Sequence, residues 1–303
     1  MEKEKTKRGN FPTQLILITL VIGLIVVLGY FFLNRNTQEV QDSEENNAEV
    51  EKMIETNAEE VVVIFEDEIL ENHIREELGI PTGDITSTDM LELYYITISK
   101  LGVTNLTGLE YALELIEFSL LRENVESLEP LKNLNNLERL SLHYNVIENL
   151  PIQFSKDVNL NHVSIVNTPI EDASFLSHMT NVEHLTMTDA SLEDISSVKN
   201  LTNVTQLNVR GNEIKDISAL EGKDNLEILN LQSNEVSDVS SLTGLKKLYD
   251  LVLSFNPIYN LKPLETLPSL RVLVVHLDHD VKHLIFDQVK VFESAGIEVQ
   301  YTR

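Results

Sequence analysis

The 303-residue chain contains no cysteine, which excludes disulfide bonds, zinc–thiolate sites and lipid-modified cysteine. Basic residues are also scarce: 23 lysines and arginines stand against 49 aspartates and glutamates, for a formal net charge of -26 at pH 7. A nucleic-acid interface needs clustered Lys and Arg to neutralise phosphates, so this composition argues against a nucleic-acid partner. The lack of cysteine does not by itself assign a compartment.

Signatures of common enzyme classes are missing as well. The chain has no phosphate-binding loop, no H-E-x-x-H and no G-x-S-x-G. We therefore expect no enzyme activity, no catalytic residues and no cofactor.

What the chain does contain is one pattern repeated every 22 residues. The repeats that begin at Val182, Val204, Leu226 and Leu248 share the form L-x-x-L-x-L-x-x-N-x-I-x-D-I-x-x-L. A fixed period of this length is typical of a solenoid, and the form resembles the leucine-rich repeat. Four earlier repeats and a partial ninth begin at Leu93, Leu115, Leu137, Leu160 and Leu270, with a one-residue insertion around 151–154.

The chemistry of one repeat predicts its conformation. Leu226, Leu229 and Leu231 would point inward from a short strand, since side chains alternate between its faces. Asn234 would turn the corner and bond backbone groups of neighbouring turns, and Asp238 would cap a short helical turn on the convex side. One turn cannot bury its own apolar face, so the turns must stack.

The corner asparagine is present in only half of the repeats, which predicts an interrupted ladder of side-chain hydrogen bonds in the middle of the stack. It stands at Asn145, Asn212, Asn234 and Asn256, and its place is taken elsewhere by Leu101, Glu123, Thr168 and Ala190.

A membrane anchor is predicted near the N-terminus. Residues 15–33 are almost wholly apolar, and 19 residues suffice to cross a bilayer core of about 30 Å. Four basic residues precede this run, so the positive-inside rule puts the N-terminus in the cytoplasm and the rest of the chain outside. A cleaved signal peptide is the competing interpretation, but no small-residue cleavage site follows the run. A third interpretation of this apolar run is a helix buried in a protein core.

Two amphipathic helices are expected to cap the first repeat. Residues 65–81 place Leu70, Ile74 and Leu78 on one helical face, with Gly79 as the C-cap, and a second short helix would begin at Thr86. The segments 64–79, 81–90 and 103–112 resemble the cap and first repeat of bacterial internalin-like leucine-rich repeat proteins. The resemblance covers about residues 64–273. Because the chain shows neither a Leu-Pro-x-Thr-Gly sorting signal nor an immunoglobulin-like domain, host-receptor binding is not implied.

The C-terminal residues should cover the other end of the stack with a helix at 280–295 and a strand at 297–301. The predicted fold is an α/β leucine-rich repeat solenoid, with parallel strands on its concave face and short helical turns on its convex face. Its parts are a cytoplasmic N-terminus (1–12), a transmembrane helix (13–33), an acidic disordered linker (34–60), a helical N-terminal cap (61–92), the repeats (93–275) and a C-terminal cap (276–303).

Binding residues are expected on the strands, between the inward leucines. One region of this acidic chain clusters aromatic and potentially cationic side chains, and these are typical interface anchors. The predicted patch is Arg139, His143, Tyr144, His162, His184, Arg210 and Phe255. An ordinary solvated strand face is the alternative.

Two sets of histidines are candidate metal ligands. His162 and His184 would share one column on adjacent strands, but a third ligand is lacking, so no zinc is expected. The other set, His276, His279 and His283, is interpreted as solvated cap residues.

The sequence thus predicts a membrane-anchored cell-surface protein that binds a protein partner through its concave face and catalyses nothing. The alternative is a cell-envelope sensor or assembly factor that binds wall material or a membrane-protein neighbour. A third hypothesis is an intracellular scaffold resembling the 22-residue-repeat phosphatase regulators, and the apolar run at 15–33 counts against it.

Overall fold

A computed structural model describes residues 60–149, 158–170, 173–276 and 282–302. The predicted cytoplasmic N-terminus, the transmembrane helix at 13–33 and nearly all of the linker lie outside these residues. Within the described ranges, no helix combines the length and the apolar character needed to cross a membrane.

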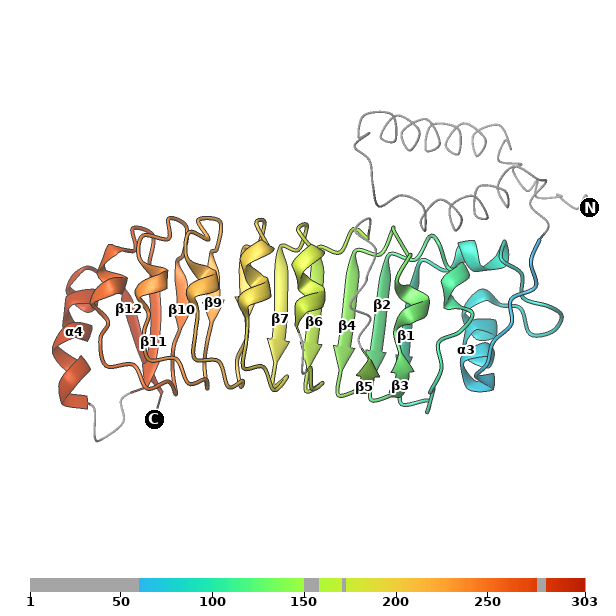
Figure 1. Ribbon diagram of the computed structural model, residues 1–303, viewed down its shortest axis with the longest axis horizontal. Coiled ribbons are helices and arrows are strands. Elements are labelled where there is room, and N and C mark those ends of the chain that lie inside the picture. Colours follow the sequence, from blue (N-terminus) through green and yellow to red (C-terminus); the bar gives the residue numbers. More distant parts are fainter. Residues whose placement is uncertain (1–59, 150–157, 171–172, 277–281, 303) are drawn as a thin grey trace, which may run out of the picture. The chain divides into compact units, whose positions relative to one another are not determined.

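One parallel sheet of ten strands runs through the described residues, and Figure 1 shows its strands side by side. Each strand pairs in step with the next, as in Tyr95 opposite Glu117 and Leu251 opposite Leu273. The strands, in spatial order, are β1 (Tyr95–Ser99), β2 (Glu117–Leu121), β4 (Arg139–His143), β6 (His162–Val166), β7 (His184–Thr188), β8 (Gln206–Asn208), β9 (Ile228–Asn230), β10 (Asp250–Val252), β11 (Val272–His276) and β12 (Glu298–Thr302). A small second sheet pairs β3 (Asn124–Ser127) with β5 (Val146–Asn149).

Short 3₁₀ turns connect the strands on the other side of the core. They lie at Leu109–Tyr111, Glu129–Leu131, Ser174–His178, Ser196–Asn200, Ser218–Leu220, Ser240–Leu242 and Lys262–Thr266. The predicted capping aspartate lies two residues before the turn: Asp238 Oδ1 accepts from the N–H of Ser240 at 2.8 Å. Asp216 bonds the N–H of Ser218 in the same way, at 2.7 Å.

The inward leucines form one continuous core. Leu226, Leu229 and Leu231 are all fully buried, as predicted, and the same positions are buried in the neighbouring repeats. Each buried aliphatic side chain contributes roughly 1.5–3 kcal/mol. The parallel sheet with short turns fits a leucine-rich repeat solenoid.

The corner asparagines bond as predicted. Asn234 is buried; its Oδ1 accepts from Ile214 N at 3.1 Å, and its Nδ2 donates to the carbonyls of Val209 and Leu231, both at 2.9 Å. The Asn234 amide therefore satisfies backbone groups of its own turn and of the preceding one.

The predicted interruption of this ladder is wrong at two of the substituted corners. The buried Glu123 carboxylate accepts from the N–H groups of Leu101, Gly102 and Val103 at 2.7–2.9 Å. The Thr168 hydroxyl accepts from Asn145 N and donates to Leu142 O, both at 3.1 Å. Carboxylate and hydroxyl oxygens accept backbone N–H groups as an amide does, which keeps the ladder intact there.

At Ala190 the ladder does lose a side chain. Its own N–H donates to Asn212 Oδ1 at 3.0 Å, but a methyl group accepts nothing from the preceding turn. Leu101, at the corner of the first repeat, likewise has no side-chain donor or acceptor. Between the first repeat and the last described corner, the interruption is therefore confined to Ala190.

The N-terminal cap begins with α3 (Glu68–Leu78), three residues later than the start of the predicted helix. Asp67 is its N-cap, and Gly79, with φ 68°, is its C-cap. A 3₁₀ turn at Asp89–Glu92 follows. Thr86 and Asp89 form the predicted capping box, since Asp89 Oδ2 accepts from Thr86 N at 2.8 Å and Thr86 Oγ1 accepts from Asp89 N at 3.2 Å.

The C-terminal end carries α4 (Lys282–Ser294) and β12, within two residues of the predicted helix and strand. Ile285, Val289 and Phe292 are buried against the last repeats. These elements cover the apolar end of the stack.

Candidate partner-binding face

The in-step pairing of the strands lines up their outward side chains in columns. From β2 to β10, the first outward position of each strand forms one column: Glu117, Arg139, His162, His184, Gln206, Ile228 and Asp250. The second outward position forms a parallel, mostly polar column: Ser119, Ser141, Ser164, Thr186, Asn208, Asn230 and Val252. We call the surface that carries both columns the strand face.

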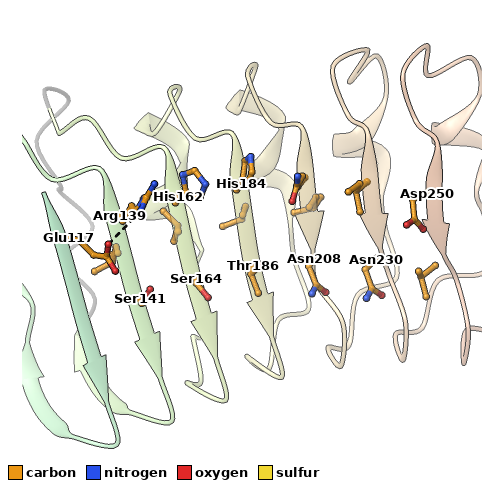
Figure 2. Close-up of a pocket in the computed structure, with 17 residues that line it drawn as sticks. Glu117, Arg139, Ser141, His162, Ser164, His184, Thr186, Asn208, Asn230 and Asp250 are labelled. Carbon is orange, nitrogen blue, oxygen red and sulfur yellow. Dashed lines mark ion pairs between the residues drawn. The ribbon is translucent and has the colours of Figure 1, made fainter. Parts of the chain in front are cut away.

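A groove of about 670 Å³ runs along the strand face from β2 to β10. Side chains of both columns line it, as Figure 2 shows. Its polar groups are hydroxyls, amides and imidazoles, with one charged pair towards β2 and one carboxylate at β10. This arrangement suits the binding of an extended polar chain.

The charges towards β2 compensate each other. Arg139 Nη1 lies 3.7 Å from Glu117 Oε2, drawn as the dashed line in Figure 2. Both side chains are partly exposed, so the pair contributes little to stability. It leaves that end of the groove nearly neutral.

The two histidines next to this pair stack. The ring centroids of His162 and His184 are 4.2 Å apart, with the planes tilted by 40°. Burial lowers the pKa of His162, and the nearby His184 and Arg139 lower it further. Glu183 and Glu138 oppose these effects, but the net shift of the pKa is downward and favours the uncharged imidazole. Burial also lowers the pKa of His143, whose Nε2 is 2.8 Å from Ser164 Oγ.

No metal centre is formed by the residues that the structure describes, because no three His, Cys, Asp or Glu side chains come together in them. In the C-terminal set of histidines, His279 lies outside the described residues. His276 instead stacks on Phe255, with ring centroids 4.3 Å apart, and its Nδ1 is 3.0 Å from Thr302 O.

Two of the predicted binding residues occupy the corners that follow the strands. Tyr144 and Phe255 each precede a corner asparagine and adopt left-handed backbone conformations, with φ 59° and 58°. Both side chains are exposed, and the Arg122 guanidinium lies 5.3 Å from the centre of the Tyr144 ring. Tyr144 is roughly 16 Å along the strand direction from Arg139, at about 3.3 Å per residue.

The structure therefore separates the predicted patch into two sets. Arg139, His162 and His184 line the groove. The other four, His143, Tyr144, Arg210 and Phe255, lie nearer the corners and do not line it.

The prediction passed over Asp250, Asn208 and Asn230, which line the groove at its other end. Their position in the repeat marks them as outward-facing strand residues, but they are neither cationic nor aromatic, so they do not belong to the predicted patch.

The parallel sheet, the short turns and the corner ladder fit a leucine-rich repeat solenoid. A sequence model for "Leucine Rich repeats (2 copies)" matches residues 202–247. A leucine-rich repeat domain implies protein–protein interaction; such folds are typically non-enzymatic, and no catalytic activity is shown.

Solved structures show which leucine-rich repeat proteins this chain is similar to. Internalin C2 of Listeria monocytogenes is 26% identical, covering 73% of this chain and 99% of its own, with a TM-score of 0.63. A leucine-rich repeat protein of Leptospira interrogans is 19% identical over 66% of this chain and 52% of its own, with a TM-score of 0.58, and it shows the fold alone. No curated protein sequence matches. The chain is thus structurally similar to internalins and other bacterial leucine-rich repeat proteins.

Proposed function

We propose that this chain is a membrane-anchored protein of the bacterial cell surface that binds a protein partner through its strand face. The observation that carries the binding proposal is the groove of about 670 Å³, which crosses the strands from β2 to β10. The six strand steps from β2 to β10, at about 4.8 Å each, make a face about 29 Å long, enough for a standard protein interface.

The anchor is supported by the amino-acid sequence. Residues 15–33 form the longest apolar run of the chain, and Lys3, Lys5, Lys7 and Arg8 precede it. The acidic segment 34–60 would then hold the repeats outside the cell, close to the membrane.

Substitution at the centre of the groove tests the binding proposal. Thr186→Arg places a long charged side chain in the groove, at a position whose hydroxyl has no hydrogen-bond partner among the described residues. Thr202→Arg makes the same change on an exposed turn. Crosslinking on intact cells followed by purification of the full chain should recover a protein partner with wild type and Thr202→Arg, and lose it with Thr186→Arg.

Recovery of the same amount of protein partner by Thr186→Arg and Thr202→Arg would show that the groove is not the binding surface. If wild type recovers wall polysaccharide instead of a protein and Thr186→Arg does not, the result would favour the alternative, a cell-envelope sensor that binds wall material. Protease added to intact cells should cleave an epitope in the repeats; full protection in intact cells and cleavage after lysis would contradict the surface location.

A further inference from the structure

The carboxylate of Asp250 lies at the β10 end of the groove. It is half-buried in the groove, and among the described residues it makes no ion pair. Burial raises the pKa of its carboxyl group, and the negative charge of Glu298 raises it further. The groove's arginine, Arg139, lies five strand steps away, or about 24 Å, and is already paired with Glu117.

The surroundings of this carboxylate are aliphatic. Ile228 and Val272 are its register partners on the adjacent strands, and Val252 is the next outward residue of its own strand. All three side chains are half-buried. Lys and Arg place their alkyl stems along apolar surface and their charged heads at a carboxylate, so the setting suits either of them.

Next to Asp250, two asparagines present hydrogen-bond donors to the groove. Asn208 Oδ1 accepts from Arg210 N at 3.2 Å, and Asn230 Oδ1 accepts from Gln232 N at 2.9 Å. These bonds orient both amides, and neither Nδ2 donates to a described residue. Each Nδ2 carries two N–H groups, so the groove floor offers donors to carbonyl oxygens. Figure 2 shows both asparagines on the strands that precede Asp250.

We infer that the groove over β8 to β10 binds an extended polypeptide segment whose Lys or Arg side chain docks on Asp250. Asn208 and Asn230 donate to the backbone carbonyls of that segment, and Ile228 and Val272 contact the alkyl stem of the basic residue. A glycan fits less well, because it would bring no cation to the carboxylate and no Trp, Tyr or Phe ring lines the groove for sugars to stack on. This inference rests on the proposed function and specifies its partner.

Peptide selection on the purified full-length chain tests it. Short random peptides displayed on phage would be selected at physiological salt, and those retained should carry Lys or Arg at a common position. One selected peptide is then measured by fluorescence anisotropy against wild type, Asp250→Asn and Glu221→Gln. Glu221 is the matched control, since its exposed side chain lies outside the groove and has no partner among the described residues.

Asp250→Asn should weaken binding roughly tenfold, whereas Glu221→Gln should leave it unchanged. The charge-reversed combination, Asp250→Lys with a Glu in place of the peptide's basic residue, should recover most of the lost affinity. Thermal unfolding of Asp250→Asn should match or exceed that of wild type, because the substitution removes a desolvated charge next to Glu298.

Equal weakening by Asp250→Asn and Glu221→Gln would show that only bulk charge attracts the peptide, and would overturn the inference. Selected peptides that need no basic residue but lose binding in Thr186→Arg would overturn it and leave the proposed function standing. Peptides that bind both Thr186→Arg and Asp250→Asn as well as they bind wild type would contradict both. Binding of glycans but not of peptides would overturn the inference in favour of wall material.

Discussion

At the corners of the coil, backbone N–H groups turn into the core and need an acceptor, whatever residue supplies it. Asn234 supplies an amide, Glu123 a carboxylate and Thr168 a hydroxyl. A buried N–H without a partner costs about 1–3 kcal/mol, which explains why three different chemistries occupy equivalent places.

The first prediction concerns one of these corners. Asn234→Ala should lower the free energy of unfolding by about 1–3 kcal/mol, because it leaves the buried Ile214 N–H without an acceptor. The carbonyls of Val209 and Leu231 lose one donor each but keep the amides of Asn212 and Asn256. Urea denaturation followed by circular dichroism measures the change. Asn200→Ala, on an exposed turn, is the control and should change it by less than about 0.5 kcal/mol. A small effect at Asn234 would mean that water replaces the amide.

A second residue-scale prediction concerns Lys223, which is buried where the neighbouring repeats have Leu201 and Leu245. Its Nζ donates to the carbonyls of Lys199 and Leu201, at 2.7 and 2.8 Å. Burial lowers its pKa in the folded state. The unfolded chain therefore binds more protons at alkaline pH, and stability should rise as pH increases from the folded pKa towards about 10.4.

Lys223→Leu should abolish the rise of stability at alkaline pH. It should also increase the free energy of unfolding at pH 7 by about 1 kcal/mol, because a buried leucine avoids the cost of desolvating an ammonium group. Urea titrations at pH 7 and at alkaline pH measure both effects. Lys262→Leu, at an exposed site, should leave the rise in place. A variant less stable than wild type at pH 7 would show that the two bonds to carbonyls outweigh the burial of the ammonium group.

At the scale of elements, one side chain connects the cap to the repeats. Asp67 Oδ1 accepts from Ile69 N and Leu70 N at the start of α3, while its Oδ2 accepts from Thr104 N at 2.7 Å in the first repeat. Burial alone would raise the pKa of Asp67, but hydrogen bonds from the backbone of Thr104, Leu70 and Asn105 hold it below its ordinary value.

Because the folded pKa of Asp67 is depressed, its stabilisation is present above the unfolded pKa of about 3.9 and is lost as pH falls through the folded pKa. Asp67→Ala should therefore cost about 2–3 kcal/mol at pH 7 and reduce the acid-induced loss of stability. Glu68 is exposed in the same helical turn, so Glu68→Ala should change neither the stability at pH 7 nor its loss in acid. Denaturant titrations at pH 7 and below pH 4 provide the comparison. An unchanged acid transition in Asp67→Ala would contradict this assignment.

At the scale of the whole repeat stack, each turn is stabilised mainly by its contacts with the neighbouring turns. A substitution that destabilises one end should therefore affect mainly the turns near that end. Phe292 of α4 is buried against the last repeats, whereas Phe286 of the same helix is 41% exposed. Phe292→Ala should lower stability by about 3–4 kcal/mol, and Phe286→Ala by much less.

Hydrogen exchange measured by mass spectrometry locates this effect. In Phe292→Ala, amides of β10, β11 and β12 should lose protection, while those of β1 and β2 should keep theirs. Uniform loss of protection from β1 to β12 would show that the stack unfolds as a single unit.

The period of 22 residues was enough to predict the strands, their register and the inward leucines, because each repeat places the same local pattern in the same conformation. The capping box at Thr86 and the C-cap at Gly79 were equally predictable, since they depend on residues only a few positions apart. The transmembrane helix and the surface location stay predictions.

Two features were decided by tertiary structure alone. One is the repair of the corner ladder at Glu123 and Thr168, whose partners lie 20 or more residues away in the chain. The other is the chemistry of the groove, where the uncompensated charge of Asp250 and the oriented amide of Asn230 depend on neighbouring turns and on the backbone beyond the strand. Local patterns determine which way a side chain points; its charge balance and hydrogen bonds depend on groups that only stacking brings within reach.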